Sequence, residues 1–153
     1  MQNASILFVC LGNICRSPVA EGLLRSRAAA AGIEVLVDSA GTGDWHLGQP
    51  PHEGAQAVAT ANGLDLSGLC ARQVTEQDWF DFTHLIALDR SNFQDLEELR
   101  PANAKASLSM LMDHAGRDGE DVIDPYGMEE AAFSQMYAQI DEGVAGLLQA
   151  LSR

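Results

Sequence analysis

The chain has 153 residues, and we expect residues 1–153 to form a single domain with its own core. Hydrophobic residues make up 46% of it, which excludes a disordered chain, and no apolar stretch approaches the ~20 residues of a membrane span. Nine basic residues against 22 acidic ones give a net charge of −13, so nucleic acid and anionic membranes are not expected as partners.

The first ten residues, MQNASILFVC, predict a cytoplasmic protein. They lack a positively charged start, and their apolar run is too short for a secretory signal. In that compartment thiols stay reduced, so we expect Cys10, Cys15 and Cys70 to be free.

The first element along the chain is a buried strand over residues 4–10, which Gly12 and Asn13 end. Ser17 then suits the N-cap of a helix and Pro18 its first position. This helix is expected to end near Gly32, a residue type common just after a helix.

Strands and helices continue to alternate after this first pair. The remaining strands are predicted over residues 33–41, 84–89 and 105–111, and the remaining helices over residues 53–63, 76–82, 91–100 and from 129 onward. Polar loops are expected over residues 41–52 and 113–127. This order predicts an α/β fold, a four-stranded, mostly parallel twisted sheet with helices on both faces.

Four polar residues are predicted to meet at one edge of that sheet. Cys10, Ser39 and Asp89 end three strands, and Asp124 lies in the loop after the fourth. Because ligands in such folds bind beyond the carboxyl ends of the strands, this edge is the expected site.

The loop from Cys10 to Arg16 has the composition of a phosphate-binding loop after the first strand. Backbone N–H groups between a strand end and a helix start form an anion nest. Helix N-termini and nearby cations also lower the pKa of a cysteine thiol from about 8.5 to about 3.5–7.5. Arg16 supplies a planar fork that pairs with phosphate oxygens. The loop is not an NTP-binding loop, because Gly12 stands alone and no Lys follows it.

Attack of a cysteine on a phosphate ester also needs a proton for the leaving group. Asp124 in the segment DPYG is the candidate donor, held on a loop by Pro125. Trp45 and Tyr126 are candidates for the pocket wall, where they would stack on an aromatic leaving group.

The motifs CLGNICRSP, DSAGT, ARQ, SN after Asp89, and DPY resemble those of the low-molecular-weight protein tyrosine phosphatases. They stand in the family's order, at near-family spacing, from Ile6 to the last helix. The loop together with a downstream DPY in so short a chain is highly specific.

The resemblance implies hydrolysis of phosphotyrosine and aryl phosphate monoesters. Cys10 would be the nucleophile that becomes a phosphocysteine, Arg16 would bind phosphate oxygens, and Asp124 would act as general acid and then as base. Ser17 would stabilise the thiolate. The phosphate-binding segment would comprise Leu11, Gly12, Asn13, Ile14, Cys15, Arg16 and Ser17.

Further implications concern support and partners. Asn13, in a left-handed conformation, would bond to Ser39, and Asp89 would orient the arginine. The family needs no metal and no organic cofactor. Its substrates are phosphotyrosine proteins, and a cognate tyrosine kinase is a further candidate partner. One departure is Gly127, where many relatives carry a second aromatic residue, so the pocket wall is expected to be lower.

Several alternatives stay open at this stage. A thiol-dependent arsenate reductase shares the fold and loop, but it needs two further cysteines, and residues 71–153 contain none. A non-catalytic phosphotyrosine-binding module is the other alternative. Cys15 is placed to form a reversible protective disulfide with Cys10. The four histidines lack metal-ligand spacing and are taken as ordinary loop or strand residues: His46, His52, His84 and His114.

Overall fold

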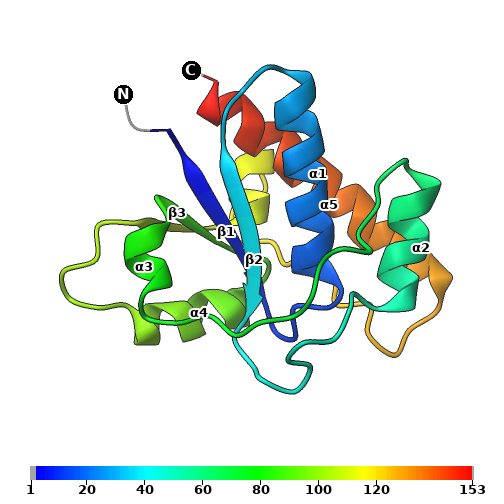
Figure 1. Cartoon of the computed structure of the whole chain (residues 1–153), viewed down its shortest axis with the longest axis horizontal. Coiled ribbons are helices and arrows are strands. Elements are labelled where there is room, and N and C mark those ends of the chain that lie inside the picture. Colours follow the sequence, from blue (N-terminus) through cyan, green and yellow to red (C-terminus); the bar gives the residue numbers. More distant parts are fainter. Residues whose placement is uncertain (1–2, 153) are drawn as a thin grey trace.

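A four-stranded parallel sheet forms the centre of the computed structural model, which describes residues 3–152. The strands are β1 (Ser5–Cys10), β2 (Leu36–Gly41), β3 (His84–Ala87) and β4 (Ser107–Met110). Their spatial order is β2-β1-β3-β4, with every neighbouring pair parallel (Figure 1). The α/β fold with a parallel sheet is therefore confirmed.

Helices pack on both faces of this sheet. They are α1 (Arg16–Ala30), α2 (Glu53–Ala61), α3 (Asp78–Asp81), α4 (Arg90–Leu99) and α5 (Glu130–Leu151), with a 3-10 helix at Leu111–Ala115. Helices α1 and α5 run side by side on one side of the sheet, to the right of the strands in Figure 1, whereas α3 and α4 lie on the other side. No helix within residues 3–152 is both long enough and apolar enough to cross a bilayer.

The central strand β1 divides the core into two apolar clusters because successive side chains of a strand point to opposite faces. Ile6 and Phe8 join the cluster built with α1 and α5. Leu7 and Val9 join the cluster that contains Trp79 and Leu96. Burial on both faces explains why β1 reads as a continuous apolar run rather than as an alternating pattern.

The start of α1 differs from the sequence prediction. Ser17 is not the N-cap, because α1 begins at Arg16 and Cys15 occupies the cap position without a side-chain hydrogen bond. The Ser17 hydroxyl instead lies 2.9 Å from Cys10 Sγ. Pro18 thus occupies the third helical position, where it costs little, since the first four N–H groups of a helix have no intrahelical acceptor.

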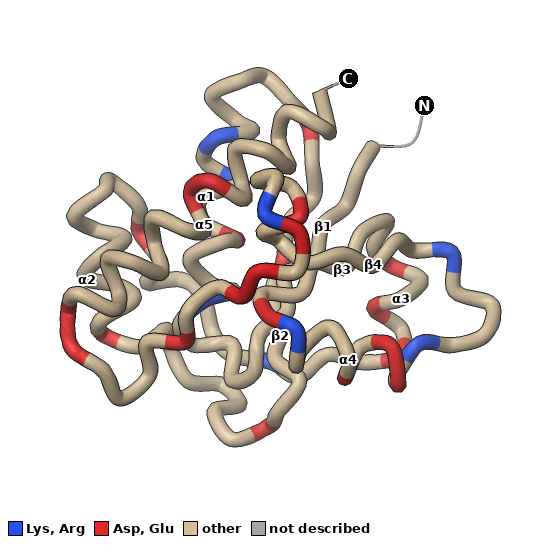
Figure 2. Tube along the Cα trace, turned by 180° about the vertical axis from the view of Figure 1, so that it is seen from behind, with Lys and Arg blue, Asp and Glu red and all other residues tan. Residues whose placement is uncertain are grey.

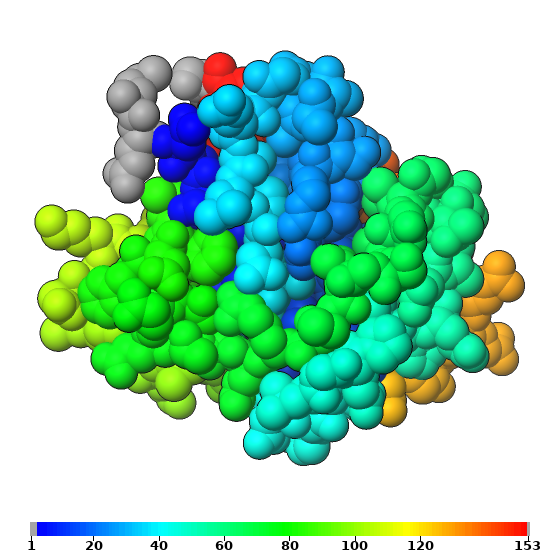
Figure 3. All heavy atoms as spheres, viewed as in Figure 1, coloured from blue at the N-terminus to red at the C-terminus, as the bar shows by residue number. Residues whose placement is uncertain are grey.

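Two further element boundaries, the end of β3 and the start of the loop after β4, differ from the sequence prediction. Strand β3 ends at Ala87, and Asp89 caps α4 instead by accepting a 2.7 Å hydrogen bond from the Asn92 backbone N–H. The predicted loop over residues 113–127 begins inside the 3-10 helix Leu111–Ala115. Figure 3 shows the segment between β2 and α2 protruding below the sheet, at the edge where the strands end.

Candidate active site

The loop after β1 folds around the sulfur of Cys10. The Asn13 backbone N–H donates to Cys10 Sγ at 3.3 Å, and Ser17 Oγ lies 2.9 Å from the same atom. Cys10 is 2% exposed, so these contacts take place almost out of water. Hydrogen bonds donated to sulfur favour its negatively charged form, which is the form that acts as a nucleophile.

Asn13 fixes the shape of this loop. Its φ of 58° is the only positive φ of a non-glycine residue within residues 3–152. Its side-chain Nδ2 donates to Ser17 Oγ at 2.8 Å and to Ser39 Oγ at 3.0 Å, while its Oδ1 accepts from the Arg72 backbone N–H at 3.0 Å. Three hydrogen bonds to one buried side chain hold a backbone conformation that asparagine tolerates better than most residues.

Glu21 extends this network, and sequence reasoning did not find it. Its buried carboxylate accepts from Ser39 Oγ at 2.6 Å and from Arg25 Nη2 at 2.6 Å. Arg25 also donates to the Val37 carbonyl oxygen at 2.7 Å. Ser39 is therefore held from α1 while it supports Asn13, so the loop that carries Cys10 is tied to β2.

Arg16 is buried beside the same loop and is oriented from two sides. Its Nη1 donates to Asp89 Oδ2 at 2.7 Å and to the Val122 carbonyl oxygen at 3.2 Å. Its Nη2 lies 3.7 Å from Asp124 Oδ2. Burial by itself would lower the pKa of the Arg16 guanidinium, but the charges of Cys10, Asp89 and Asp124 raise it overall. The guanidinium therefore stays positive in the site.

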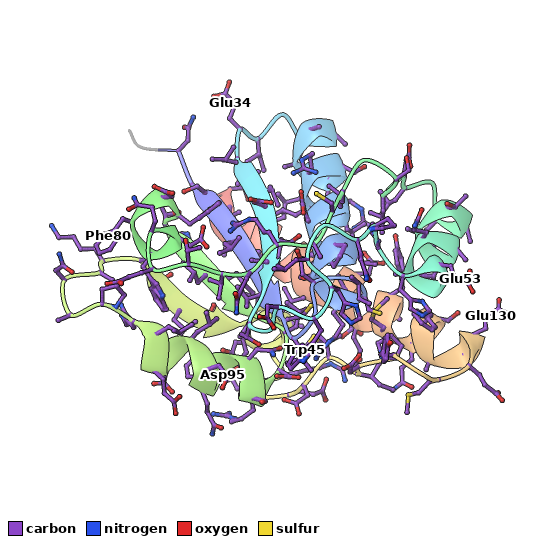
Figure 4. The ribbon with its side chains drawn as sticks, turned by 60° about the horizontal axis from the view of Figure 1, so that its bottom comes forward. Glu34, Trp45, Glu53, Phe80, Asp95 and Glu130 are labelled. Carbon is purple, nitrogen blue, oxygen red and sulfur yellow. The ribbon has the colours of Figure 1, made fainter. Side chains whose placement is uncertain are left out.

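A small pocket of about 140 Å³ opens above Cys10. Asp124 stands at its mouth with a side chain 43% exposed, and its Oδ1 accepts from the Tyr126 backbone N–H at 3.2 Å. Trp45 and Tyr126 are 66% and 57% exposed and form the walls (Figure 4 labels Trp45). The lining residues are Cys10, Leu11, Gly12, Ile14, Cys15, Arg16, Trp45, His46, Asp124 and Tyr126.

His46 also lines this pocket, which was not predicted from the sequence. Its ring centroid lies 5.8 Å from that of Tyr126, and its Nδ1 lies 3.0 Å from Gln49 Oε1. A Cβ atom on Gly12 would come within 2.9 Å of the His46 ring, so only glycine fits easily beneath it. Adjacency to Trp45 was the only signal in the sequence that could have found it.

Cys10 and Cys15 both lie in the pocket lining as buried free thiols. Cys70 is also a free thiol, but it is exposed at the surface away from the pocket. Burial, then the nearby charges of Cys10 and Asp124, raise the pKa of Cys15 to about 12, although Arg16 acts in the opposite direction. Cys15 is therefore neutral at physiological pH and is not itself a nucleophile there.

The raised pKa of Cys15 leads to a prediction for chemical labelling of the thiols. At pH 7 to 9 iodoacetamide is expected to alkylate Cys10 and exposed Cys70 while Cys15 stays unmodified, because a thiol with a pKa of about 12 is almost fully protonated in that range. Inorganic phosphate in the loop should protect Cys10 but not Cys70. Peptide mapping by mass spectrometry checks this, and labelling of Cys15 ahead of Cys10 would contradict it.

Comparison with known proteins agrees with this geometry. The family model described as low molecular weight phosphotyrosine protein phosphatase matches residues 5–153. The protein-tyrosine-phosphatase YfkJ of Bacillus subtilis is 41% identical over 152 residues, which is 97% of this chain and 96% of that protein. A crystal structure of YfkJ superimposes with a TM-score of 0.91 at 40% identity, covering 99% of this chain and 96% of that one.

A second structural relative is an arginine phosphatase from Drosophila. It superimposes with a TM-score of 0.91 at 31% identity, covering 97% of this chain and 98% of the other. Matches to named phosphatases thus extend over nearly the whole chain, and Cys10 and Arg16 lie at the two ends of the loop that joins β1 to α1. This chain belongs to the low molecular weight phosphotyrosine protein phosphatases and is a hydrolase of phosphate monoesters.

Proposed function

We propose that this phosphatase dephosphorylates tyrosine through a phosphocysteine on Cys10. The observation that carries the proposal is the position of Cys10 Sγ, buried between the Asn13 N–H and the Ser17 hydroxyl on the loop that ends at Arg16. A sulfur held in this way is aimed at any phosphate that the loop N–H groups bind.

In the first step the Cys10 thiolate attacks phosphorus and forms an S–P bond, while the bond from phosphorus to the tyrosine oxygen breaks. Asp124, at the pocket mouth, gives its proton to the leaving phenolate oxygen. In the second step Asp124 accepts a proton from water as the water attacks phosphorus. The S–P bond breaks, inorganic phosphate leaves, and the thiolate returns.

Arg16 binds two oxygens of the phosphoryl group and stabilises the charge that builds on them. Asp89 acts as a positioning residue, because its 2.7 Å bond to Nη1 leaves Nη2 free to point toward the pocket. The backbone N–H groups of residues 11–16 complete the cradle. Ser17 and Ser39 support the sulfur and Asn13 respectively.

The pocket walls favour an aromatic leaving group. Trp45 and Tyr126 offer flat faces to the ring of phosphotyrosine, and Leu11 and Ile14 add apolar surface. Phosphotyrosine proteins are therefore the proposed substrates. By dephosphorylating them, the enzyme would oppose a cognate tyrosine kinase in the cytoplasm. Tyr126 and Gly127 are both exposed at the mouth of the pocket, so this side of the site faces solvent.

Turnover of matched phosphopeptides tests the substrate. The value of kcat/KM for a phosphotyrosine peptide should exceed those for phosphoserine and phosphoarginine peptides by about 100-fold or more, since neither alternative side chain offers a ring to the walls. Preferred turnover of phosphoarginine would contradict the proposal, and so would arsenate-dependent consumption of thiol without phosphatase activity.

A further inference from the structure

A second hollow lies beside the catalytic pocket, between helices α2 and α5. It has a volume of about 680 Å³. Its surface combines small and apolar side chains with two carboxylates, and we call it the α2–α5 groove. The lining residues are His52, Glu53, Gly54, Ala57, Val58, Ala61, Asn62, Met128, Glu130, Phe133 and Ser134.

Small residues on α2 keep the α2–α5 groove open. Ala57 and Ala61 are exposed along it, and Met128 on the opposite side is 55% exposed. Gly54 allows α2 to approach α5 closely, because a Cβ there would lie 2.6 Å from the Phe133 ring. The groove thus offers apolar surface large enough to cover one aliphatic side chain.

A short row of aromatic rings connects this groove to the catalytic pocket. Tyr126 forms the pocket wall, and its ring centroid lies 5.7 Å from that of His52. His52 in turn stacks on Phe133 at 5.2 Å, and both of these residues line the groove. His52 is held in place because its Nδ1 accepts from the Gly54 backbone N–H at 3.0 Å. An extended peptide advances roughly 3.3 Å per residue. About three residues would therefore cover the path from the Tyr126 ring, past His52, to the Phe133 ring.

The charges at the α2–α5 groove are all of one sign. Glu53 and Glu130 are both exposed, and Figure 4 shows them close together at the facing ends of α2 and α5. Neither forms an ion pair within residues 3–152. Residues 53–71 and 118–152 contain no Lys or Arg, and the colouring in Figure 2 shows no basic position along α2. A basic side chain therefore complements this groove, and an acidic one does not.

We propose that the α2–α5 groove binds the part of the substrate that flanks the phosphotyrosine. It takes an aliphatic side chain about three residues from the phosphotyrosine and a Lys or Arg next to that side chain. The aliphatic group lies against Met128 and Phe133, while the cation faces Glu53 and Glu130. This inference rests on the proposed function, because it extends the peptide from a phosphotyrosine already bound above Cys10.

Synthetic phosphotyrosine peptides test the proposal. One series carries Leu or Ser three residues from the phosphotyrosine, on either side of it, and a second series adds Arg or Ser beside that position. The peptide with Leu and Arg on the preferred side should give a kcat/KM about tenfold above its Ser–Ser counterpart. That difference should narrow at high salt, because the cation contributes part of it.

Variants in the groove test its negative charge and its apolar surface separately. Replacing Glu53→Gln and Glu130→Gln together should reduce the preference for Arg about threefold. Replacing Ala57→Trp, or Ala61→Trp in its place, should fill the groove and remove the preference for Leu. The matched control is Glu97→Gln with Glu98→Gln on α4, which makes the same charge change at exposed positions outside the groove and should change neither preference.

Turnover of p-nitrophenyl phosphate, which has no flanking residues, should stay the same in all these variants. Equal kcat/KM for all peptides, or peptide preferences that the groove variants leave intact, would overturn the groove proposal while the catalytic assignment stood. A wild-type enzyme that turned over neither p-nitrophenyl phosphate nor any phosphotyrosine peptide would instead overturn the proposed function, and this inference with it.

Discussion

Replacing Cys10 by serine is expected to lower turnover of p-nitrophenyl phosphate by about 10⁴-fold or more. A serine hydroxyl is a weak nucleophile unless a base removes its proton, and the groups against this position are the Asn13 N–H and the Ser17 hydroxyl, which support an anion and do not deprotonate an alcohol. Steady-state kinetics measures the loss.

The same variant should still bind inorganic phosphate. The backbone N–H groups of the loop and the Arg16 guanidinium do not depend on the sulfur, and Arg16 remains oriented by Asp89 and the Val122 carbonyl. Calorimetric titration with phosphate checks this. Cys70→Ser, which changes an exposed thiol, is the control and should behave as wild type. Turnover by Cys10→Ser at more than a few per cent of the wild-type rate would contradict the assignment of the nucleophile.

Replacing Asp124 by asparagine is expected to lower kcat by about 10²- to 10⁴-fold for phenyl phosphate. An amide cannot give a proton to the leaving oxygen, and phenolate leaves poorly without one. The loss should be much smaller for p-nitrophenyl phosphate, whose leaving group is a weaker base. The dependence of the rate on leaving-group pKa, measured over a series of aryl phosphates, should therefore become steeper in Asp124→Asn.

Asp118→Asn is the matched control, because Asp118 is exposed on the segment that leads to Asp124 and does not line the pocket. It should leave the leaving-group dependence unchanged. If Asp124→Asn slowed all aryl phosphates by the same factor, Asp124 would act by position or charge and not as the acid.

The fold was predictable because its signals are local. Each strand is a short apolar run, and the helices that follow show apolar residues at helical spacing. Because strands and helices alternate along the chain, a parallel sheet is expected. The meeting of Cys10, Ser39, Asp89 and Asp124 at one edge follows from that topology, since parallel strands all end on the same side.

The details that the sequence did not reveal depend on contacts between distant segments. Ser17 has the composition of an N-cap, yet its hydroxyl lies against Cys10 Sγ and Asn13 Nδ2, which no local propensity includes. Glu21 reads as a solvent-facing helix residue, but the Ser39 hydroxyl from β2 and Arg25 give it buried partners.

The positions of His46 in the catalytic pocket and of His52 in the α2–α5 groove were not predicted, for a related reason. His46 and His52 lie on a long loop whose path cannot be derived from periodicity, and both become part of an aromatic row only because Tyr126 arrives from the other end of the chain. The α2–α5 groove was likewise invisible, since it needs the spacing of two helices whose residues are about 75 positions apart.

The covalent intermediate is the central claim, and trapping it is the most direct test. Enzyme mixed with excess p-nitrophenyl phosphate, denatured within milliseconds and digested with trypsin should yield the peptide of residues 1–16 with one added phosphoryl group. Fragmentation should place that group on Cys10 and not on Cys15. Full turnover without any phosphorylated Cys10, or with the phosphoryl group on another residue, would contradict the account.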